Sequence, residues 1–252
     1  MTFDDDVVLQ RRLNPLESET RSMLLDCLKE SPIPSSESLN NMGLFMDRRF
    51  ISRMLFVDEM YRRQLGLHGS IFEFGVRYGQ NLALLMGCRG IYEPYNHNRK
   101  ILGFDTFSGF PSVHEADTDN HSVGDYSVPP DYRSFLERVL TLHESMAPMD
   151  SIKKFELIEG DASTTVREYL AKRPETIISL AYFDFDIYQP TLDCLKAILP
   201  YLNRGAVIGF DEINDREWPG ESVALREVLT LSKFEIYHSK YRANAGYLIY
   251  TP

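Results

Sequence analysis

Acidic side chains follow several short apolar runs in this chain of 252 residues, and their type and spacing suit cation binding. Asp184 follows one such run, and Asp211 and Glu212 follow another. Carboxylates that pack together repel one another unless a cation neutralises them, and all-oxygen ligation selects a hard ion such as Mg²⁺. The sequence therefore predicts a divalent-cation site at these three residues, with Asp186 as the alternative ligand. The competing interpretation is that all of them are solvated loop acids.

Three further acids follow other apolar runs and suit a nucleoside-like ligand. Glu73 opens a Glu-x-Gly-x-x-x-Gly pattern with Gly75 and Gly79, and it can accept hydrogen bonds from a cationic or hydroxylated ligand. Asp105 is placed to accept from two ribose hydroxyls, and Asp161 from an exocyclic amine such as that of adenine. The alternatives are an ordinary strand–helix turn at the glycines and a helix cap at Asp161.

The elements that must position these acids are short apolar runs that alternate with helical stretches. This alternation predicts βαβ units around a parallel sheet, at whose carboxyl edge ligands bind. The last two runs are separated by only seven residues, too few for a helix, so we expect that pair to be antiparallel. The predicted strands are Ser70–Phe74, Ile101–Phe104, Phe155–Ile158, Ile177–Phe183, Ala206–Phe210, Lys233–His238 and Gly246–Tyr250.

Two helices are expected before the first strand, over residues 16–30 and about 49–65. In the second, Arg49, Arg53 and Arg63 are predicted on a solvated face, unless one of them reaches an anionic ligand group. The opposite, apolar stripe is predicted from residues that recur at steps of three and four, which are Phe50, Met54, Val57, Tyr61 and Leu65. We expect an N-terminal helical extension over residues 1–66 and the α/β domain over residues 67–252.

The charge of the chain excludes some classes of partner. It has 27 Lys and Arg against 37 Asp and Glu, a net charge of −10, and no basic stripe, which argues against nucleic acid. No apolar run approaches the roughly 18 residues of a membrane span, so no membrane partner is expected. The acidic N-terminus lacks the basic region of a signal peptide, and three scattered cysteines favour a reducing compartment. We therefore expect a cytoplasmic protein.

The negative charge is concentrated between residues 111 and 150, a segment that contains eight acidic residues and two arginines. Residues 111–130 are predicted to form a long loop, and loops of that length are typical of lids and binding elements. We expect a lid-like insertion over about residues 111–150.

The motifs at the strand ends, taken in order, resemble the class I S-adenosylmethionine-dependent methyltransferases. More narrowly, residues 70–252 resemble the macrocin O-methyltransferase family, which methylates sugar hydroxyls on natural products. Arg204 and Glu212 depart from this family's glycine and second aspartate, and the long segment 87–100 is a further departure. The matching motifs are Glu73-Phe-Gly75-Val76-Arg-Tyr-Gly79, Asp105-Thr106-Phe107-Ser-Gly109-Phe-Pro111, Asp184-Phe-Asp186-Ile-Tyr188-Gln-Pro-Thr191 and the stretch from Arg204 to Asp211-Glu212.

The resemblance implies a Rossmann-like α/β fold with a seven-stranded, mostly parallel sheet, an antiparallel last pair and helices on both faces. It implies S-adenosylmethionine as cofactor, with Mg²⁺ at Asp184, Asp211 and Glu212 holding the acceptor's hydroxyls. The methionine end of the cofactor is expected near residues 73–79, the ribose at Asp105 and the adenine near residues 161–162. The cofactor residues so implied are Glu73, Phe74, Gly75, Val76, Arg77, Gly79, Asn81, Asp105, Thr106, Phe107, Asp161, Ala162 and Asp184.

The resemblance also implies a general base, a histidine in the stretch after the Asp-x-Phe-x-Gly signature. His121 matches the expected spacing best, and His114 is the second candidate. Asp186 is a third candidate because it lies two residues from a predicted metal ligand. His143 falls in a predicted amphipathic helix and is expected to be structural.

Three functions remain open from the sequence. The first is metal-assisted O-methylation of a sugar-containing small molecule in secondary metabolism, such as antibiotic biosynthesis. The second is methylation of a catechol-like aromatic diol, which uses the same metal chemistry, and the third is nucleotide binding without catalysis. The apolar cluster Leu44, Phe45 and Met46 can pack over the active site or against another subunit, and we expect a homo-oligomer.

Overall fold

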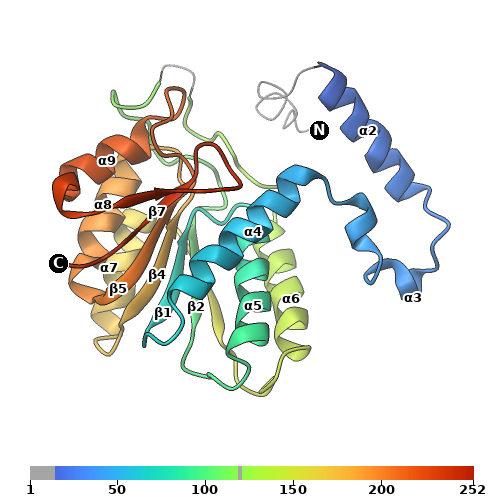
Figure 1. The fold of residues 1–252 in the computed structure, drawn as a ribbon, viewed down its shortest axis with the longest axis horizontal. Helices are drawn as coiled ribbons and strands as arrows, with labels where there is room; N and C mark the ends of the chain where they lie inside the picture. Colours follow the sequence, from blue (N-terminus) through green and yellow to red (C-terminus); the bar gives the residue numbers. More distant parts are fainter. Residues whose placement is uncertain (1–14, 119–120) are drawn as a thin grey trace. The chain divides into compact units, whose positions relative to one another are not determined.

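The computed structural model describes residues 15–118 and 121–252, and a seven-stranded sheet lies at the centre of residues 53–252 (Figure 1). The strand order is β3-β2-β1-β4-β5-β7-β6. The first five strands are parallel to their neighbours, and β7 pairs antiparallel with both β5 and β6. The predicted fold class is therefore confirmed, including the antiparallel last pair.

The apolar runs of the sequence locate all seven strands. The largest difference is at β5, which begins four residues before the predicted start. Its first residues pair with β4 across a register shift, and Gly205 adopts a left-handed backbone (φ 90°), so the apolar alternation is interrupted there. The strands are β1 (Ser70–Phe74), β2 (Ile101–Asp105), β3 (Phe155–Glu159), β4 (Ile178–Phe183), β5 (Leu202–Phe210), β6 (Ile236–His238) and β7 (Gly246–Ile249).

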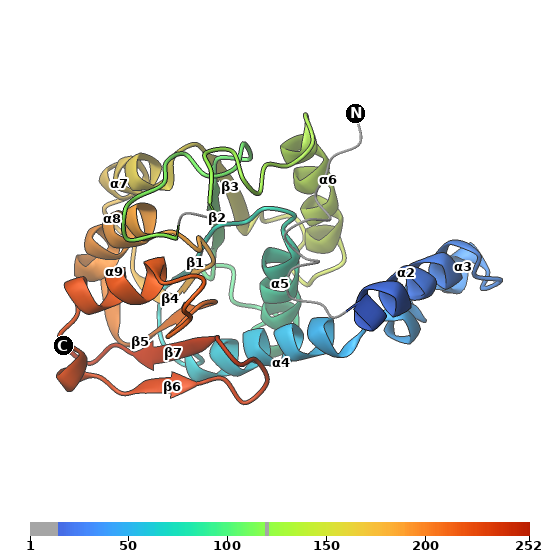
Figure 2. The ribbon, with the colours of Figure 1, turned by 90° about the horizontal axis from the view of Figure 1, so that it is seen from above.

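Helices cover both faces of the sheet (Figures 1 and 2). One face carries α5 (Gln80–Tyr92), α6 (Tyr132–Ser145) and the second half of α4 (Arg48–Arg63), and their side chains share one core cluster. The other face carries α7 (Ala162–Lys172), α8 (Tyr188–Ile198) and α9 (Gly220–Val228) over a second cluster. Successive side chains of a strand enter opposite clusters, as the pleat requires.

Four phenylalanines form a ladder of rings beneath the carboxyl ends of the strands. Phe74 of β1 pairs in register with Phe104 of β2 and Phe183 of β4, and Phe183 pairs with Phe210 of β5. The ring centroids are 5.1, 4.7 and 5.2 Å apart along this order, and all four side chains are fully buried. The ladder aligns the ends of four neighbouring strands, and Asp105, Asp184 and Asp211 follow it immediately.

Helix α4 differs from its predicted orientation. Its buried residues are Phe56, Val57, Met60 and Tyr61, and Arg53 lies on this same face rather than on the opposite, solvated one. Apolar side chains of this helix lie on several of its faces, so more than one apolar stripe fits a helical period. Only packing against the sheet selects between these stripes. Two members of the predicted stripe, Met54 and Leu65, are more than a third exposed.

The segment between β1 and β2 that departs from the family motif has a structural role. Helix α5 continues to Tyr92, and the chain then turns so that the Arg99 side chain, 1% exposed, enters the protein. Arg99 donates to the Glu93 carboxylate, the Ser179 hydroxyl and the Leu67 carbonyl. This buried arginine joins the starts of β1 and β4, because Leu67 precedes β1 and Ser179 lies in β4.

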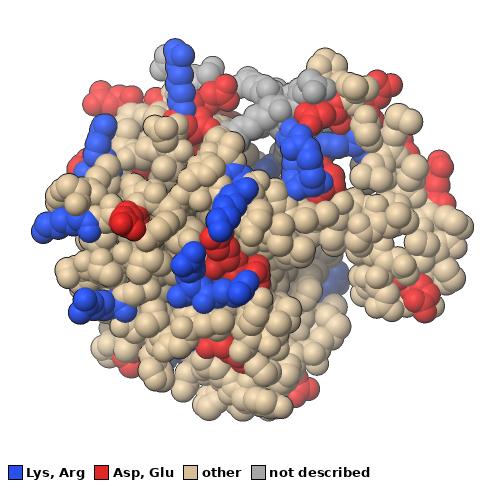
Figure 3. All heavy atoms as spheres, in the orientation of Figure 1, with Lys and Arg blue, Asp and Glu red and all other residues tan. Residues whose placement is uncertain are grey.

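The chain divides into two compact units, residues 1–52 and 53–252, with the boundary inside α4. The first unit contains α2 (Pro15–Lys29), α3 (Ser35–Ser38) and the 3₁₀ helix η1 (Met42–Phe45), in none of which is a residue buried. No helix in the described part of the chain is both long and apolar enough to cross a membrane. Figure 3 shows basic and acidic side chains interspersed over the face of residues 53–252 that it presents.

Removing one ring of the ladder should destabilise the fold. We predict that Phe183→Ala lowers the free energy of unfolding by about 3–5 kcal/mol, since the side chain is fully buried between two other rings. Urea unfolding followed by circular dichroism measures this change. The control is Tyr95→Ala, at a ring that is 78% exposed and should tolerate truncation. Equal effects of the two substitutions would contradict the role given to the ladder.

Candidate active site

The turns after β1 and β2 are joined through Asp105. Its Oδ2 accepts hydrogen bonds from the backbone N–H groups of Val76 (2.7 Å) and Arg77 (2.8 Å), and its Oδ1 accepts from that of Phe107 (2.6 Å). Arg77 and Phe107 both adopt left-handed backbone conformations, with φ of 46° and 53°. Strained turns of this kind persist where surrounding contacts determine them, and here Asp105 supplies those contacts.

The two motif glycines allow close packing at the same edge of the sheet. Gly75 has a φ of 88°, and a Cβ atom there would collide with the backbone carbonyl of Asp184. Gly79 has a φ of 77° and precedes the first residue of α5, where a Cβ would meet the Leu136 side chain. Glycine is therefore required at both positions, and the N-terminus of α5 lies beside the end of β1 as expected.

Glu73 is fully buried in β1, and neither of its carboxylate oxygens has a hydrogen-bond partner within the described residues. Burial, together with the neighbouring charge of Asp184, raises the pKa of Glu73 well above its usual value, although Asn81 and Arg53 offset part of this rise. Buried polar atoms are nearly always paired. The side chain is thus an acceptor that a ligand with N–H or O–H groups can satisfy.

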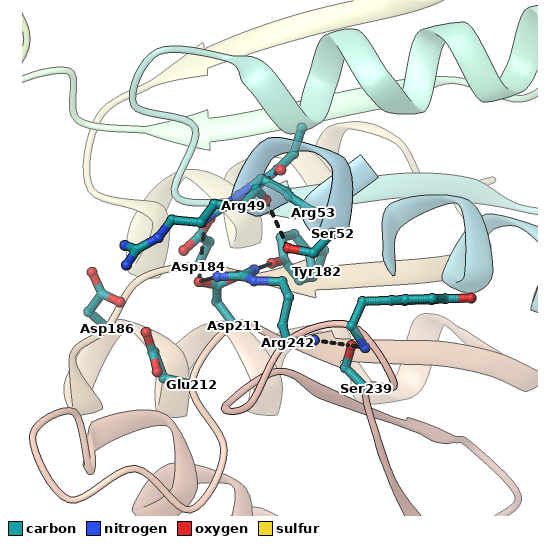
Figure 4. A network of polar contacts seen from close by, with 12 residues as sticks. Arg49, Ser52, Arg53, Tyr182, Asp184, Asp186, Asp211, Glu212, Ser239 and Arg242 are labelled. Carbon is teal, nitrogen blue, oxygen red and sulfur yellow. Dashed lines mark hydrogen bonds and ion pairs between the residues drawn. The ribbon is translucent and has the colours of Figure 1, made fainter. Parts of the chain in front are cut away.

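Asp184 lies at the centre of a polar network at the end of β4 (Figure 4). Its Oδ2 accepts from Nη1 of Arg53 at 3.1 Å and from Nδ2 of Asn81 at 3.2 Å. The same arginine lies 3.6 Å from Oδ2 of Asp211, so it bridges the ends of β4 and β5. Burial and the charge of Asp211 raise the pKa of Asp184 to about 6 despite this arginine.

Asp211 has a second cationic partner in Arg242, from the loop between β6 and β7 (Figure 4). The guanidinium donates to both carboxylate oxygens, one of them at 2.8 Å, and the Tyr182 hydroxyl donates to Oδ1. Burial acts to raise the pKa of Asp211, but Arg242 and Arg53 outweigh it and hold the pKa well below its usual range. Asp211 is therefore ionised, whereas neighbouring Asp184 is held only weakly in its charged form.

The three predicted metal ligands are brought to one region but not into one cluster. Within residues 15–118 and 121–252, no group of three His, Cys, Asp or Glu side chains is arranged to hold a metal ion. Arg53 and Arg242 instead neutralise Asp184 and Asp211. The chemistry of the site still suits a hard cation, because its ligand atoms are oxygens and its acids outnumber the two arginines. Burial is the main cause of the raised pKa of Asp184, and the charge of Asp211 adds to it.

Both candidate histidines are held by contacts with their own loop and with residues outside it. The ring of His121 stacks on Trp218 with centroids 3.9 Å apart, and its Nε2 lies 2.8 Å from the Thr118 hydroxyl. Nδ1 of His114 accepts from the backbone N–H of Ala116, and its ring packs on Tyr188. These contacts involve both rings in holding the lid-like segment.

Asp186, the third candidate base, follows Asp184 in the loop after β4. Its backbone adopts a φ of 63°, a left-handed conformation that aspartate tolerates better than most residues. Its N–H and that of Glu212 bind the two oxygens of one carboxylate, that of Glu221. Asp186 and Glu212 therefore lie close to one another beside Asp184 (Figure 4).

The other predicted cofactor residues have mixed surroundings. Asp161 caps α7 by accepting from Ser163 N–H at 2.9 Å, which is the alternative stated for it, and Ala162 is buried in the first turn of that helix. The Thr106 hydroxyl donates to the Gly109 carbonyl at 2.6 Å. The rings of Phe74 and Phe107 and the side chain of Val76 belong to the core, so only their backbones are available to a ligand.

Sequence patterns did not identify the partners of these acids. Arg242 lies in a short connection with no recognisable motif, and Arg53 was predicted on a solvated face. Glu221 was not singled out either, although an acid in the first turn of a predicted helix is a common feature. The position of Tyr182 could have been predicted. Its side chain points to the opposite face of β4 from Phe183, which is the face that carries Glu73 on the paired strand β1.

Solved structures show what this chain is similar to. The crystal structure of CalS11, calicheamicin methyltransferase, is 41% identical, covers 96% of this chain and 95% of its own, and superposes with a TM-score of 0.92. The chain belongs to the class I sugar O-methyltransferase family. The apo structure of CalS11, a TDP-rhamnose 3'-O-methyltransferase in calicheamicin biosynthesis, is 39% identical with a TM-score of 0.85, and it covers 96% of this chain and 97% of its own. The family resemblance predicted from the strand-end motifs is thus confirmed.

More distant comparisons add only the fold. The O-methyltransferase NovP is 17% identical to this sugar O-methyltransferase, with a TM-score of 0.61 over 80% of this chain and 81% of its own. No protein-family model and no curated protein matches the chain. Membership of the family therefore rests on the CalS11 structures, and it makes this protein an S-adenosylmethionine-dependent O-methyltransferase.

The ion pair between Arg242 and Asp211 should be important for stability. We predict that Arg242→Met lowers the free energy of unfolding by about 3 kcal/mol at neutral pH, because it leaves a buried carboxylate with one partner fewer. Since pairing lowers the pKa of Asp211, this contribution is present above the unfolded pKa and is lost as pH falls. Chemical denaturation at pH 7 and at about pH 3, which is below the ordinary aspartate pKa, should therefore show a smaller difference from wild type at the lower pH.

The control is Arg167→Met, which removes the exposed partner of Asp193 on the surface. Exposed pairs contribute about 0–1 kcal/mol, so this variant should remain close to wild type at both values of pH. A loss for Arg242→Met that does not depend on pH would contradict the pairing described here.

Proposed function

We propose that this enzyme methylates a hydroxyl of a nucleotide-activated deoxysugar of the TDP-rhamnose type. The observation that carries the proposal is the 41% and 39% identity to CalS11 over nearly the whole of both chains. In the reaction, the acceptor oxygen attacks the sulfonium methyl group, the S–CH₃ bond breaks and an O–CH₃ bond forms. The hydroxyl proton passes to a base, and S-adenosylhomocysteine and a methyl ether are the products.

The cofactor is proposed to lie along the carboxyl edge of β1, β2 and β3. The unpaired oxygens of Glu73 support binding of the cationic methionine end, since they are buried acceptors without donors. Asp105 keeps acceptor capacity beyond its three backbone contacts, which supports a role at the ribose hydroxyls. Asp161 and Ala162 at the start of α7 are proposed to adjoin the adenine.

Asp186 is the proposed general base. It lies in the same loop as Asp184, and its carboxylate can accept the proton of a hydroxyl bound beside the network. The contacts of His121 with Trp218 and Thr118, and those of His114 with Ala116 and Tyr188, favour the aspartate over either histidine.

Acceptor choice tests this function. With S-adenosylmethionine present, we expect turnover of TDP-rhamnose to exceed that of catechol by about 100-fold or more, because a site that binds the further polar groups of a sugar nucleotide discriminates strongly against an acceptor with only two phenolic hydroxyls. Mass spectrometry of the methylated product measures both rates, and isothermal titration calorimetry measures cofactor binding. Faster methylation of the aromatic diol would replace the proposal with the second function, and an absence of cofactor binding by the folded protein would refute both.

Metal assistance is a separate proposal. Asp184, Asp211 and Glu212 are the residues proposed to hold a Mg²⁺ ion, supported by their oxygen donors and by the negative charge that Arg53 and Arg242 leave uncompensated. Such an ion supplies Lewis-acid polarisation of the acceptor hydroxyl when it is bound. Its entry requires Arg53 and Arg242 to release the two aspartates.

Chelation tests this dependence. We expect EDTA treatment to lower kcat by about 100-fold and Mg²⁺ to restore it, which corresponds to the loss of several kcal/mol of charge stabilisation. Titration of Mg²⁺ into the apoprotein should release or absorb heat, and Asp184→Asn should abolish both that heat and turnover. Full activity after exhaustive chelation would show that the two arginines suffice to balance the carboxylates.

A further inference from the structure

Glu221, in the first turn of α9, is a buried acid that neither the cofactor site nor the proposed chemistry uses. Its side chain is 0% exposed. Oε1 accepts from the backbone N–H groups of Phe185 (3.0 Å) and Asp186 (3.3 Å), and Oε2 accepts from that of Glu212 (3.2 Å). One carboxylate thus joins the loop after β4 to the loop after β5, which carry the proposed base and a proposed metal ligand.

A purely structural role explains this arrangement poorly. Burying a carboxylate costs free energy unless its partners repay the loss of hydration, and here the donors are neutral backbone groups. An apolar side chain would leave these three backbone N–H groups without their acceptor, so the carboxylate is explained by the geometry that it imposes on the two loops.

The geometry that it imposes is unusual at Asp186. The left-handed backbone there, with a φ of 63°, is a conformation that costs free energy for a residue with a Cβ atom. The hydrogen bond from the backbone N–H of Asp186 to the Glu221 carboxylate holds Asp186 in this conformation. The turn is fixed on its other side by Asp117, whose Oδ1 accepts from the N–H of Tyr188 at 2.8 Å.

The start of α9 is tightly packed against the start of α8. A Cβ on Gly220 would lie 2.5 Å from the backbone nitrogen of Tyr188 and 2.6 Å from Oδ1 of Asp117. The first turn of α9 therefore packs directly on the first turn of α8, and Glu221 has little freedom to move away from the two loops.

We propose that Glu221 is a positioning residue, which sets Asp186 and Glu212 relative to one another by holding the backbones of both loops. This rests on the proposed function, since it assigns Glu221 to the same reaction. Glu221 touches neither acceptor nor cofactor in this role. It acts through the backbone, so its loss should affect the chemical step more than the binding of either substrate.

The test is Glu221→Gln, which keeps the size of the side chain but replaces one acceptor oxygen with an NH₂ group. That group cannot accept from a backbone N–H, so at least one of the two loops loses its partner. We expect kcat to fall by about 10- to 100-fold, as for other residues that orient catalytic groups. The KM for S-adenosylmethionine should stay within about twofold, because cofactor contacts are unchanged.

A matched control is Glu227→Gln, at an exposed acid on the same helix whose partners are Tyr188 and Lys196. Hydrogen exchange followed by mass spectrometry supplies a second measurement that does not need turnover. Peptides that contain residues 185–186 and 212 should exchange about tenfold faster in Glu221→Gln than in wild type or in the control, at one loop or both.

These measurements separate the possible outcomes. Unchanged kcat, or a fall in kcat matched by an equal fall in the fraction of folded enzyme, would overturn the positioning role. Unchanged exchange at both loops would overturn it even if wild type proved inactive towards sugar nucleotides. Inactivity of wild type with faster exchange in the variant would refute the proposed function while leaving the loop-holding contact established.

Discussion

Like charges buried at one edge of a sheet must be compensated, and this requirement organises the active-site end of the protein. The charge of each acid is compensated in a different way. Asp105 and Glu221 accept backbone N–H groups, and Asp211 has two arginines and a tyrosine hydroxyl. Asp184 shares one arginine, and its pKa rises to about 6. The carboxylate oxygens of Glu73 have no hydrogen bond among the described residues, although Asn81 and Arg53 lower its pKa, which leaves it as an acceptor for a cationic ligand.

The compensation works only because the strand ends are in register. The phenylalanine ladder aligns the last residues of β1, β4 and β5, so the acids beyond it emerge at one level. Gly75 then lets the turn after β1 touch the end of β4. The buried layer of phenylalanines thereby supports the layer of acids beyond it. The packed rings keep these like-charged groups from moving apart.

The acidic segment 111–150 contributes to the fold as well as to the charge. Glu144 is 4% exposed and pairs with Arg89 and Lys154, joining α6 to α5 and to the residues before β3. Asp117 binds the first turn of α8. Two of the eight acids of this segment are therefore used in internal contacts. The acids proposed to bind the cofactor and the metal lie outside this segment, at the strand ends.

The sequence by itself determined the sheet, its helices and the positions of the strand-end acids, because local patterns of apolar, glycine and acidic residues specify them. It also indicated the family, through four motifs with fixed internal spacing, and the similarity to CalS11 confirms it. Only the tertiary structure decided which groups neutralise the acids. Arg53 is 131 residues from Asp184, Arg242 is 31 residues from Asp211 and Glu221 is 35 residues from Asp186, so no local pattern records these contacts. The face of α4 that is buried was decided in the same way, by packing against the sheet, since several apolar stripes fit its helical period.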